Sequence, residues 1–248
     1  MLTEQRHEEI LKILNEQKSV TLQELKDRLN TSESTIRRDL TSLHQMGRLV
    51  KVFGGAVSAE FGYSTEEEVV EHRAGVNTEA KKAIAARAAQ LIGPGSLVYI
   101  DAGTTTGCMI EFLTEKNAVY VTNGIHHAAR LSAAGFRVIL TGGELKQTTE
   151  AVIGHEAIMQ LQKYNFSIGF FGANGVTKHE GFTTPDPQEA AVKECAMKKC
   201  RKKYVLCDSS KFGQVTPVTF GAYKDAVIIT ECEPEGYKGE TNIVIVKE

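Results

Sequence analysis

The sequence predicts an α/β protein of two domains. The first is a small N-terminal domain of helices and a β-hairpin, and the second is a larger domain built on a mostly parallel sheet. Residues 3–57 place apolar side chains at helical spacing and end in an alternating basic and apolar stretch. From residue 78 onward, short apolar runs alternate with helical patterns, as in strand–helix–strand units. Residues 58–77 follow neither pattern and are expected to form a linker.

Composition narrows the class of protein. The 248 residues carry a net charge of −2, so a nucleic-acid site must come from a local patch. The five cysteines include no CxxC pair, which is typical of reduced thiols and gives no indication of a metal site or a disulfide framework. The N-terminus lacks an apolar signal core, and no run of about eighteen apolar residues occurs. We therefore expect a soluble cytoplasmic protein without a membrane segment.

Three helices are predicted in the N-terminal domain. The first covers residues 3–17. The second begins at Thr21, which forms the pattern of a capping box with Glu24, and it ends near Asn30. Ser32 is expected to cap the third, which ends at Gly47. The residues expected to face the core are Ile10, Leu11, Ile13 and Leu14 of the first helix and Leu22, Leu25 and Leu29 of the second.

The third helix separates its residues into two faces. At about 100° per residue, Leu40 and Leu43 lie within about 40° of Ile36 and form an apolar face. The opposite face carries Ser34, Arg37, Arg38 and Thr41. Arginine can read the major-groove edge of guanine, and arginine or hydroxyl side chains can hold phosphates. The alternative is an ordinary solvated helix surface.

A basic hairpin follows this helix. Residues 48–53 alternate basic with apolar side chains before Gly54-Gly55, which predicts a β-hairpin wing. Between residues 34 and 53 the chain carries four basic residues, Arg37, Arg38, Arg48 and Lys51, and one aspartate, Asp39, so this segment is positively charged. Helix, turn, basic helix and wing together predict a winged helix-turn-helix that binds double-stranded DNA. The residues expected to contact DNA are Thr21, Ser32, Ser34, Thr35, Arg37, Arg38, Thr41, Arg48, Lys51, Gly54 and Gly55.

Three segments of this domain resemble the winged-helix domain of the DeoR family of bacterial repressors. They are Thr3-Glu4-Gln5-Arg6, Ser32-Glu33-Ser34-Thr35-Ile36-Arg37-Arg38-Asp39-Leu40 and Gly54-Gly55-Ala56. The resemblance runs without a gap through about the first 57 residues, with the motifs in the family's order. Within the family the chain looks closest to the fructose-operon repressors of Gram-positive bacteria. The resemblance implies an operator DNA as partner.

The linker contains Gly62, the acidic run Glu66-Glu67-Glu68 and Gly75, and one short helical piece is expected in it. The acidic run is either a solvated face or a contact to the basic wing.

The second domain, residues 78–248, is predicted to alternate strands with helices. The first helix spans 78–92 with Ala83, Ile84, Ala88 and Leu91 inward, and further helices are expected at 125–133, 154–161 and 188–199. Strands are expected at 97–100, 118–121, 137–140, 166–171, 204–207, 226–230 and 243–246.

Small and polar residues gather where these strands end, which is where such sheets bind ligands. The five segments are Asp101-Ala102-Gly103-Thr104-Thr105-Thr106-Gly107, Thr122-Asn123-Gly124, Thr141-Gly142-Gly143, Gly172-Ala173-Asn174-Gly175 and Asp208-Ser209-Ser210-Lys211-Phe212. The first suits a phosphate at a helix N-terminus, or it is a hydroxyl-rich cap that binds nothing. Glu189 and Lys193 are either site residues or a surface ion pair, and Asp208 and Lys211 could cap a helix. Five such strand ends in succession favour a shared pocket.

Residues 78–231 resemble the effector domain of the same family, which is similar in fold to ribose-5-phosphate isomerase and CoA transferases. The resemblance implies a sugar-phosphate site, with Lys211 as a phosphate or sugar contact and fructose 1-phosphate as the first candidate ligand. The residues expected at the site are Asp101, Gly103, Thr104, Thr105, Thr106, Thr122, Asn123, Gly142, Gly143, Gly172, Asn174, Glu189, Lys193, Asp208 and Lys211. Glu231 departs from the family's usual aspartate, which leaves the role of that position open.

Three classes of function compete. The first is a repressor that releases its operator when a sugar phosphate binds, acting as a homodimer or homotetramer because one winged helix contacts one half-site. The second is a sugar-phosphate isomerase with an accessory DNA-binding domain, for which Asp101, Glu189 and Asp208 supply carboxylates. The third is an architectural DNA-binding protein, which leaves the strand-end loops unexplained. No metal-ligand, cofactor or nucleophile motif occurs, and the histidines are interpreted as surface or core residues. The repressor is favoured, with no catalytic residues.

Overall fold

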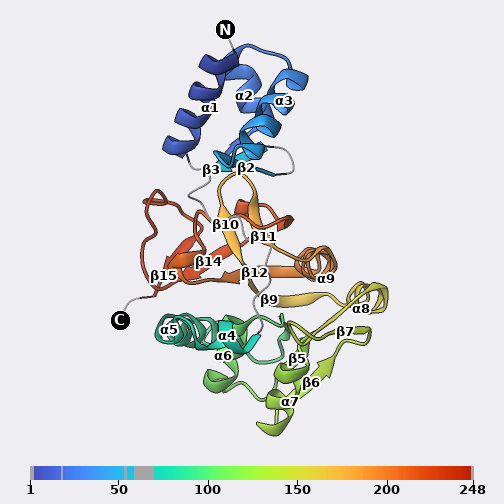
Figure 1. Ribbon diagram of the computed structural model, residues 1–248. Helices are drawn as coiled ribbons and strands as arrows, with labels where there is room; N and C mark the ends of the chain where they lie inside the picture. Colours follow the sequence, from blue (N-terminus) through green and yellow to red (C-terminus); the bar gives the residue numbers. More distant parts are fainter. Residues whose placement is uncertain (1–2, 18, 53–54, 59–69, 247–248) are drawn as a thin grey trace.

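The computed structural model describes residues 3–17, 19–52, 55–58 and 70–246, arranged as a small N-terminal domain above a larger α/β domain (Figure 1). Gly54 and the acidic run Glu66-Glu67-Glu68 lie outside the described residues.

The N-terminal domain packs three helices on a three-stranded sheet. The helices are α1 (Thr3–Gln17), α2 (Leu22–Leu29) and α3 (Glu33–Gln45). The strands are β1 (Ser19–Thr21), β2 (Leu49–Val52) and β3 (Gly55–Ser58), antiparallel in the order β1-β3-β2. The hairpin of β2 and β3 is the predicted wing. Strand β1 was not predicted, because three residues are too short for a periodic signal, and it forms by pairing with β3.

Local sequence signals set the helix boundaries. The capping box is confirmed, since the Thr21 hydroxyl accepts from the Glu24 N–H at 3.1 Å and the Glu24 carboxylate accepts from the Thr21 N–H at 3.0 Å. Asn30 ends α2 in the left-handed region at φ 45°, and Gly47 follows α3 at φ 68°. Ser32 caps α3 through the Thr35 N–H at 3.3 Å.

A buried ion pair joins α1 to α3. The Arg6 guanidinium donates to both carboxylate oxygens of Asp39, one of them at 3.0 Å, and the His7 ring approaches the same carboxylate at 3.2 Å. Asp39 is 4% exposed. Asp39, the aspartate among the basic residues of α3, therefore points into the core, where Arg6 compensates its charge.

Two helices lead into the larger domain: α4 (Val70–Gly75) and α5 (Thr78–Ala89). The short linker helix was expected, but α5 is shorter than predicted and the expectation that Ala83 faces inward was wrong. Ala83 is exposed, whereas Lys81 and Ala85 are buried beside Ile84 and Ala88. Lys81 can face inward because its ammonium donates to the backbone carbonyl of Arg73 at the end of α4.

The larger domain is built on a seven-stranded sheet whose strands all pair in parallel, which confirms the predicted fold class. In spatial order the strands are β15 (Ile243–Ile245), β14 (Val227–Thr230), β12 (Cys200–Leu206), β9 (Phe166–Gly172), β4 (Leu97–Ile100), β5 (Val119–Thr122) and β6 (Arg137–Leu140). The chain runs from β4 outward to β6 and then returns to β9 on the other side of β4. Strands β4 and β9 therefore flank the topological switch point, where such sheets bind ligands.

Each face of this sheet has its own hydrophobic core. The helices α5, α6 (Thr104–Cys108) and α7 (Ile125–Ala133) and the 3-10 turn η1 (Met109–Phe112) cover one face. The helices α8 (His155–Leu161) and α9 (Pro187–Lys198) cover the other (Figure 1). Along β4, Val98 and Ile100 enter the first core while Tyr99 enters the second, as the alternation of a strand requires.

Two small sheets and two further 3-10 turns were not predicted. β7 (Glu144–Lys146) pairs with β8 (Ala151–Ile153), and β10 (Gly175–Thr177), β11 (Gly181–Thr184) and β13 (Val218–Gly221) form the second sheet. The turns are η2 (Ser209–Lys211) and η3 (Tyr223–Asp225). At the tip of the β10–β11 hairpin, the His179 ring lies 3.8 Å from the Glu24 carboxylate of α2, so the two domains touch. Among the described residues no helix is both long and apolar enough to cross a bilayer.

Candidate functional sites

The outer face of α3 presents two arginines to solvent. Arg37 and Arg38 are exposed, whereas Ile36 on the opposite side is fully buried. The Arg37 guanidinium donates to the Glu33 carboxylate at 2.6 Å and 3.0 Å, a pair the sequence reading missed. Arg38 makes no ion pair or side-chain hydrogen bond with any residue the structure describes. An exposed i,i+4 pair is worth about 0.3–0.5 kcal/mol, so a phosphate or a base can compete with Glu33 for Arg37.

The wing continues this basic surface. The Lys51 ammonium on β2 donates to the Thr41 hydroxyl of α3 at 2.8 Å, and Arg48 is exposed just before the strand. At the start of α3 the Ser32 hydroxyl lies 3.0 Å from that of Ser34 and 2.8 Å from that of Thr35. Helix and wing thus form one surface of guanidinium, ammonium and hydroxyl groups, which we call the reading face.

Two residues predicted to contact DNA also have structural roles within the domain. Gly55 is buried where β3 crosses β1, and a Cβ there would lie 2.1 Å from the Val20 carbonyl oxygen. It is therefore needed for the close packing of β3 against β1. The Thr21 hydroxyl is engaged in the capping box of α2.

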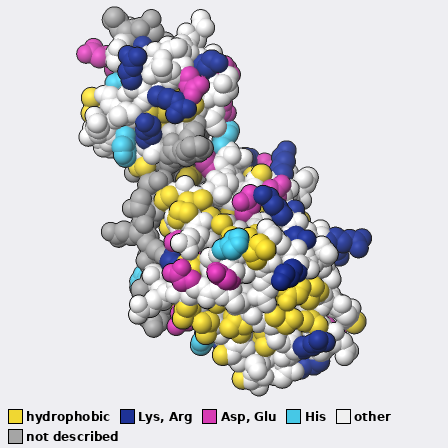
Figure 2. Space-filling view, turned by 90° about the vertical axis from the view of Figure 1, so that its right-hand side faces the viewer, with side chains coloured by type: hydrophobic (Ala, Val, Ile, Leu, Met, Phe, Trp, Pro, Cys, Tyr) yellow, Lys and Arg dark blue, Asp and Glu magenta, His cyan; other side chains and the backbone are white. Residues whose placement is uncertain are grey.

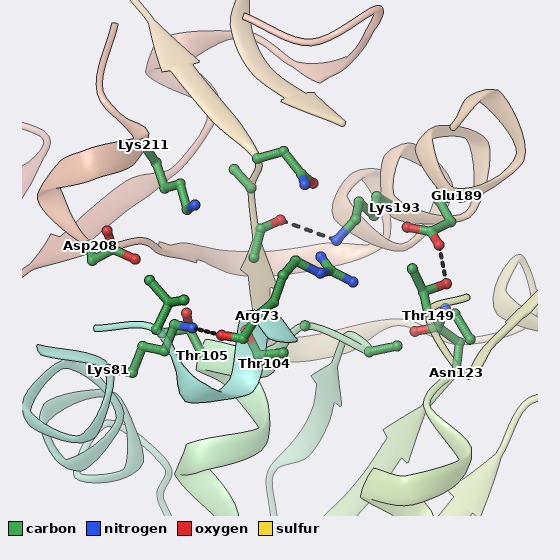
Figure 3. A pocket seen from close by; sticks show the side chains of 17 residues that line it. Arg73, Lys81, Thr104, Thr105, Asn123, Thr149, Glu189, Lys193, Asp208 and Lys211 are labelled. Atoms are coloured by element: carbon green, nitrogen blue, oxygen red, sulfur yellow. Dashed lines mark hydrogen bonds between the residues drawn. The ribbon is translucent and has the colours of Figure 1, made fainter. Parts of the chain in front are cut away.

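A cavity lies at the carboxyl ends of β4, β5, β9 and β12, at the topological switch point (Figure 3). Its volume is about 80 Å³. Most of the residues predicted for a ligand site line it: Gly103, Thr104, Thr105, Asn123, Gly172, Asn174, Glu189, Lys193, Asp208 and Lys211. Strand-end loops far apart in the sequence are thus brought together around one space.

Asp101 lies behind this cavity and does not line it. Its carboxylate, 1% exposed, accepts from the N–H of Gly172 at 2.7 Å, the N–H of Gly103 at 3.0 Å and the Thr106 hydroxyl at 2.7 Å, and it pairs with Lys193. Burial raises the pKa of this carboxyl, but Lys193 and the hydrogen bonds outweigh burial and hold the pKa below its ordinary value. Asp101 and Thr106 therefore fasten the end of β4 to the end of β9.

Three further predicted residues also lie off the cavity. The Thr122 hydroxyl accepts from the Gly124 N–H at 3.0 Å and shapes its own turn. Gly142 donates its N–H to Gln160 at 2.8 Å, and Gly143 packs where a Cβ would lie 2.5 Å from the Ile153 carbonyl oxygen. The physical reason is strand order: β6, which carries the Gly142-Gly143 loop, lies two strands from the switch point.

The charges around the cavity do not balance. Lys193 is neutralised by Asp101, and Glu189 pairs with Lys146 at 3.3 Å. The remaining charged side chains in the lining are Arg73, Lys81, Lys211 and Asp208, three cations against one carboxylate. Burial lowers the pKa of Lys81, and repulsion from Lys211 and Arg73 lowers it further against the attraction of Asp208. The cavity therefore favours an anion.

Two buried polar atoms at the cavity have no hydrogen-bond partner among the described residues. They are Oδ2 of Asp208, a residue only 1% exposed, and Nε of Arg73. The other oxygen of Asp208 accepts from the Asn77 amide at 2.9 Å and from the Ser210 N–H at 3.1 Å. An unpaired buried polar atom is costly, so this site suits a ligand that brings both donors and acceptors.

Sequence reasoning missed the polar lining residues Arg73, Lys81 and Thr149, and also the apolar residues Val76 and Ala151. One signal for Lys81 was present, because it falls on the buried face of α5 at helical spacing with Ile84, Ala85 and Ala88. A lysine on an apolar face needs a partner. No comparable signal marks Arg73 or Thr149, whose positions depend on how their segments pack.

Other candidate groups are structural. His127 is buried, its ring contacts the Gly103 carbonyl at 3.0 Å, and burial lowers its pKa to about 4, so it is neutral near pH 7. Glu231 accepts from the Ser209 N–H at 3.0 Å and the Ser209 hydroxyl at 2.6 Å, which anchors the loop that carries Lys211. In the described part of the chain, no group of three or more His, Cys, Asp or Glu side chains is placed to hold a metal ion.

Comparison with known protein families gives two matches. Residues 6–61 match the DeoR-like helix-turn-helix domain, and residues 76–231 match the DeoR C terminal sensor domain. Among curated relatives, the HTH-type transcriptional regulator FruR of Bacillus subtilis, described as uncharacterized, is 40% identical and covers 100% of both chains. The lactose phosphotransferase system repressor of Streptococcus mutans is 34% identical over 95% of this chain and 94% of its own.

Solved structures give a more distant likeness. Ribose 5-phosphate isomerase A from Methanocaldococcus jannaschii shares 16% sequence identity and a TM-score of 0.41 over 55% of each chain.

Proposed function

This chain belongs to the DeoR family of sugar-responsive transcriptional repressors, and from that premise we propose that it controls a fructose-utilisation operon. In this proposal the reading face holds the operator, and a phosphorylated sugar such as fructose 1-phosphate binds the cavity and releases the DNA. The observation that carries the effector proposal is the cavity's excess of cations beside the unpaired Asp208 oxygen. A phosphorylated sugar supplies an anion for the cations and hydroxyl donors for the carboxylate. The protein is a regulator rather than an enzyme.

The choice of sugar is supported by the relatives. The full-length relative from Bacillus subtilis carries the name FruR, and lactose phosphotransferase system repressors follow at lower identity. A panel of phosphorylated hexoses with their unphosphorylated sugars tests the proposal. We expect fructose 1-phosphate to raise the melting temperature and to release DNA in a gel shift, and free fructose to do neither. If only a different phosphorylated hexose releases the DNA, the proposed identity of the effector is wrong. If none of them releases the DNA, the effector proposal itself is refuted.

The reading face provides the test of DNA binding. Arg38→Ala or Arg37→Ala is expected to weaken operator binding by about 1–3 kcal/mol if the guanidinium contacts a guanine, with relaxed preference at one operator position. Lys51→Ala, which removes a phosphate contact, should weaken all sequences alike and flatten the dependence of affinity on salt. Gel shifts on an in vitro selected operator and on single-base variants measure both effects.

Arg201 on β12 is exposed and lies outside the N-terminal domain, so Arg201→Ala serves as the matched control. The assignment of α3 as the reading helix fails if Arg37→Ala and Arg38→Ala both bind operator like this control.

We further propose a homodimer or homotetramer, since specific affinity usually requires two half-sites. The larger domain offers apolar surface beside its edge strand β6, where Leu140, Leu145 and Met159 are exposed. Figure 2 shows hydrophobic side chains spread over the side of the molecule that carries β7 and α8. Sedimentation at micromolar concentration should show an oligomer that Leu145→Glu and Met159→Glu weaken. Ile245→Glu, at the opposite edge strand β15, is the control. A monomeric wild-type chain would contradict this proposal.

A further inference from the structure

The linker helix α4 contributes a side chain to the cavity. Arg73 extends into the space between Lys211 and Asp208 on one side and Glu189 on the other (Figure 3). Its Nε atom is buried and has no hydrogen-bond partner in the described part of the chain. In the sequence, α4 lies between the wing and α5, so the cavity is lined in part by the segment that joins the two domains.

Two hydrogen bonds within the described residues join the backbone of α4 to the larger domain. The Lys81 ammonium donates to the Arg73 carbonyl, and the Val70 N–H donates to the Thr148 carbonyl at 3.3 Å. The strands around the cavity are instead fixed on both sides by the ladder of the sheet. The position of α4 depends on contacts with α5 and with the loop before β8.

The free space is too small for the proposed ligand. The cavity measures about 80 Å³, whereas ligand sites typically measure about 300–1,000 Å³. A hexose phosphate cannot enter while Arg73 and α4 keep this position. Because α4 belongs to no sheet, we expect it to be the element that shifts to admit the ligand.

Three cations surround the place where an anion would relieve their repulsion. Asp208 attracts the buried ammonium of Lys81, whereas Lys211 and Arg73 both repel it. A phosphoryl group offers acceptor oxygens to all three and would give Arg73 Nε the partner it lacks. The anion would thus contact side chains from three segments: α4, α5 and the loop after β12.

We propose that Arg73, Lys81 and Lys211 together bind the phosphoryl group of the effector, and that Arg73 couples effector binding to DNA binding by the reading face. This inference rests on the proposed function above. Lys81 and Lys211 belong to the larger domain, so their contacts with the ligand do not depend on the position of the linker. The contact through Arg73 depends on where α4 lies, so the ligand prefers one of two linker arrangements. A ligand can shift an equilibrium only through such a difference in affinity.

The test measures the affinity of fructose 1-phosphate by calorimetry for the free repressor and for its complex with a selected operator. The ratio of the two affinities is the coupling between the sites. Arg73→Gln should weaken binding to the free protein about 10- to 100-fold, as expected for a lost charge-assisted contact, and should bring the ratio toward one. Lys211→Ala should weaken binding to both forms alike and leave the ratio unchanged.

Two further variants control for folding and for charge. Arg87→Gln removes an exposed guanidinium of α5 whose one side-chain hydrogen bond within the described residues goes to Gln90, at 3.2 Å, and it should match wild type throughout. Arg73→Lys keeps the charge without the planar fork and should retain part of the affinity and of the coupling. Melting temperatures without ligand show whether each variant is folded.

The outcomes separate this inference from the proposed function. If wild type binds fructose 1-phosphate and releases DNA but Arg73→Gln behaves like Arg87→Gln, the inference is wrong and the proposed function stands. A folded Arg73→Gln that binds the ligand more weakly with an unchanged ratio would make Arg73 an ordinary ligand contact and overturn its coupling role. If wild type binds no phosphorylated sugar, the proposed effector falls and the inference falls with it.

Discussion

Replacing Asp101 with alanine is expected to lower the free energy of unfolding of the larger domain by about 3–5 kcal/mol, the usual effect of removing one partner of a buried ion pair. Its carboxylate pairs with Lys193, itself 8% exposed, and accepts the N–H groups of Gly103 and Gly172. Alanine would leave a buried ammonium without a counterion and would remove the side-chain link between the ends of β4 and β9. Urea unfolding of the full chain, followed by circular dichroism at pH 7, measures the loss.

The pH of that experiment follows from the direction of the pKa shift. The folded-state pKa of Asp101 is below its ordinary value, so its contribution to stability is present above the unfolded carboxyl pKa of about 3.9. It is lost as the pH falls through the lower, folded-state pKa. The difference between wild type and Asp101→Ala should therefore be full at pH 7 and shrink in strong acid.

A double variant separates the charge from the packing. Asp101→Ala with Lys193→Met removes both charges and should recover part of the stability, since the buried ammonium is no longer left alone. If Asp101→Ala unfolds at the same urea concentration as wild type, the carboxylate does not hold the strand ends together. If the double variant recovers nothing, the backbone hydrogen bonds of Asp101 matter more than the ion pair.

Lys211→Ala is expected to produce a repressor that no longer responds to its inducer. The side chain lies at the cavity beside Asp208 (Figure 3), and the loss of a charge-assisted phosphate contact should cost about 1.5–3 kcal/mol of effector affinity. Calorimetry with fructose 1-phosphate measures this loss, and gel shifts with rising sugar concentration show whether DNA release moves in parallel.

Two controls accompany this experiment. Lys224→Ala removes an exposed lysine of η3 outside the cavity lining and should behave like wild type. Lys211→Arg keeps a positive charge at the site and should keep most of the affinity. Normal phosphosugar affinity in Lys211→Ala would contradict the site assignment, whereas normal affinity with lost DNA release would place Lys211 in the coupling between the domains.

The carboxylates also bear on the isomerase reading of the sequence. Asp101 is engaged in an ion pair behind the cavity, and Glu189 is bonded to Thr149 and paired with Lys146. Asp208 has an oxygen without a hydrogen-bond partner among the described residues, but Arg73, Lys81 and Lys211 line the same cavity, and such cations suit the binding of an anion. This arrangement agrees with the family membership of the chain, which is that of regulators.

The sequence by itself determined the main helices and the strands of the large sheet, and their order along the chain. The capping box at Thr21, the left-handed Asn30 and the glycine after α3 act within a few residues, so the ends of these helices can be predicted locally. The strands of the large sheet were predicted for a similar reason, since most are short apolar runs between turn residues. Strand β12 is the exception: only its apolar end was predicted, at 204–207, because its first half carries Arg201, Lys202 and Lys203. The motifs that resemble the DeoR family lie on these elements.

The tertiary structure decided which strand ends meet. The position of β9 beside β4 brings Gly172, Asn174 and Lys193 to the loop after β4, while the loop after β6 stays outside the cavity. Local periodicity does not encode the order of strands in a sheet, so Gly142 and Gly143 were predicted at the site as readily as Asn123. The same holds for Asp101, whose place behind the cavity depends on Lys193, 92 residues away in the sequence. Arg73 reaches the cavity only because α4 packs against it, a contact set by the fold and not by the residues around Arg73.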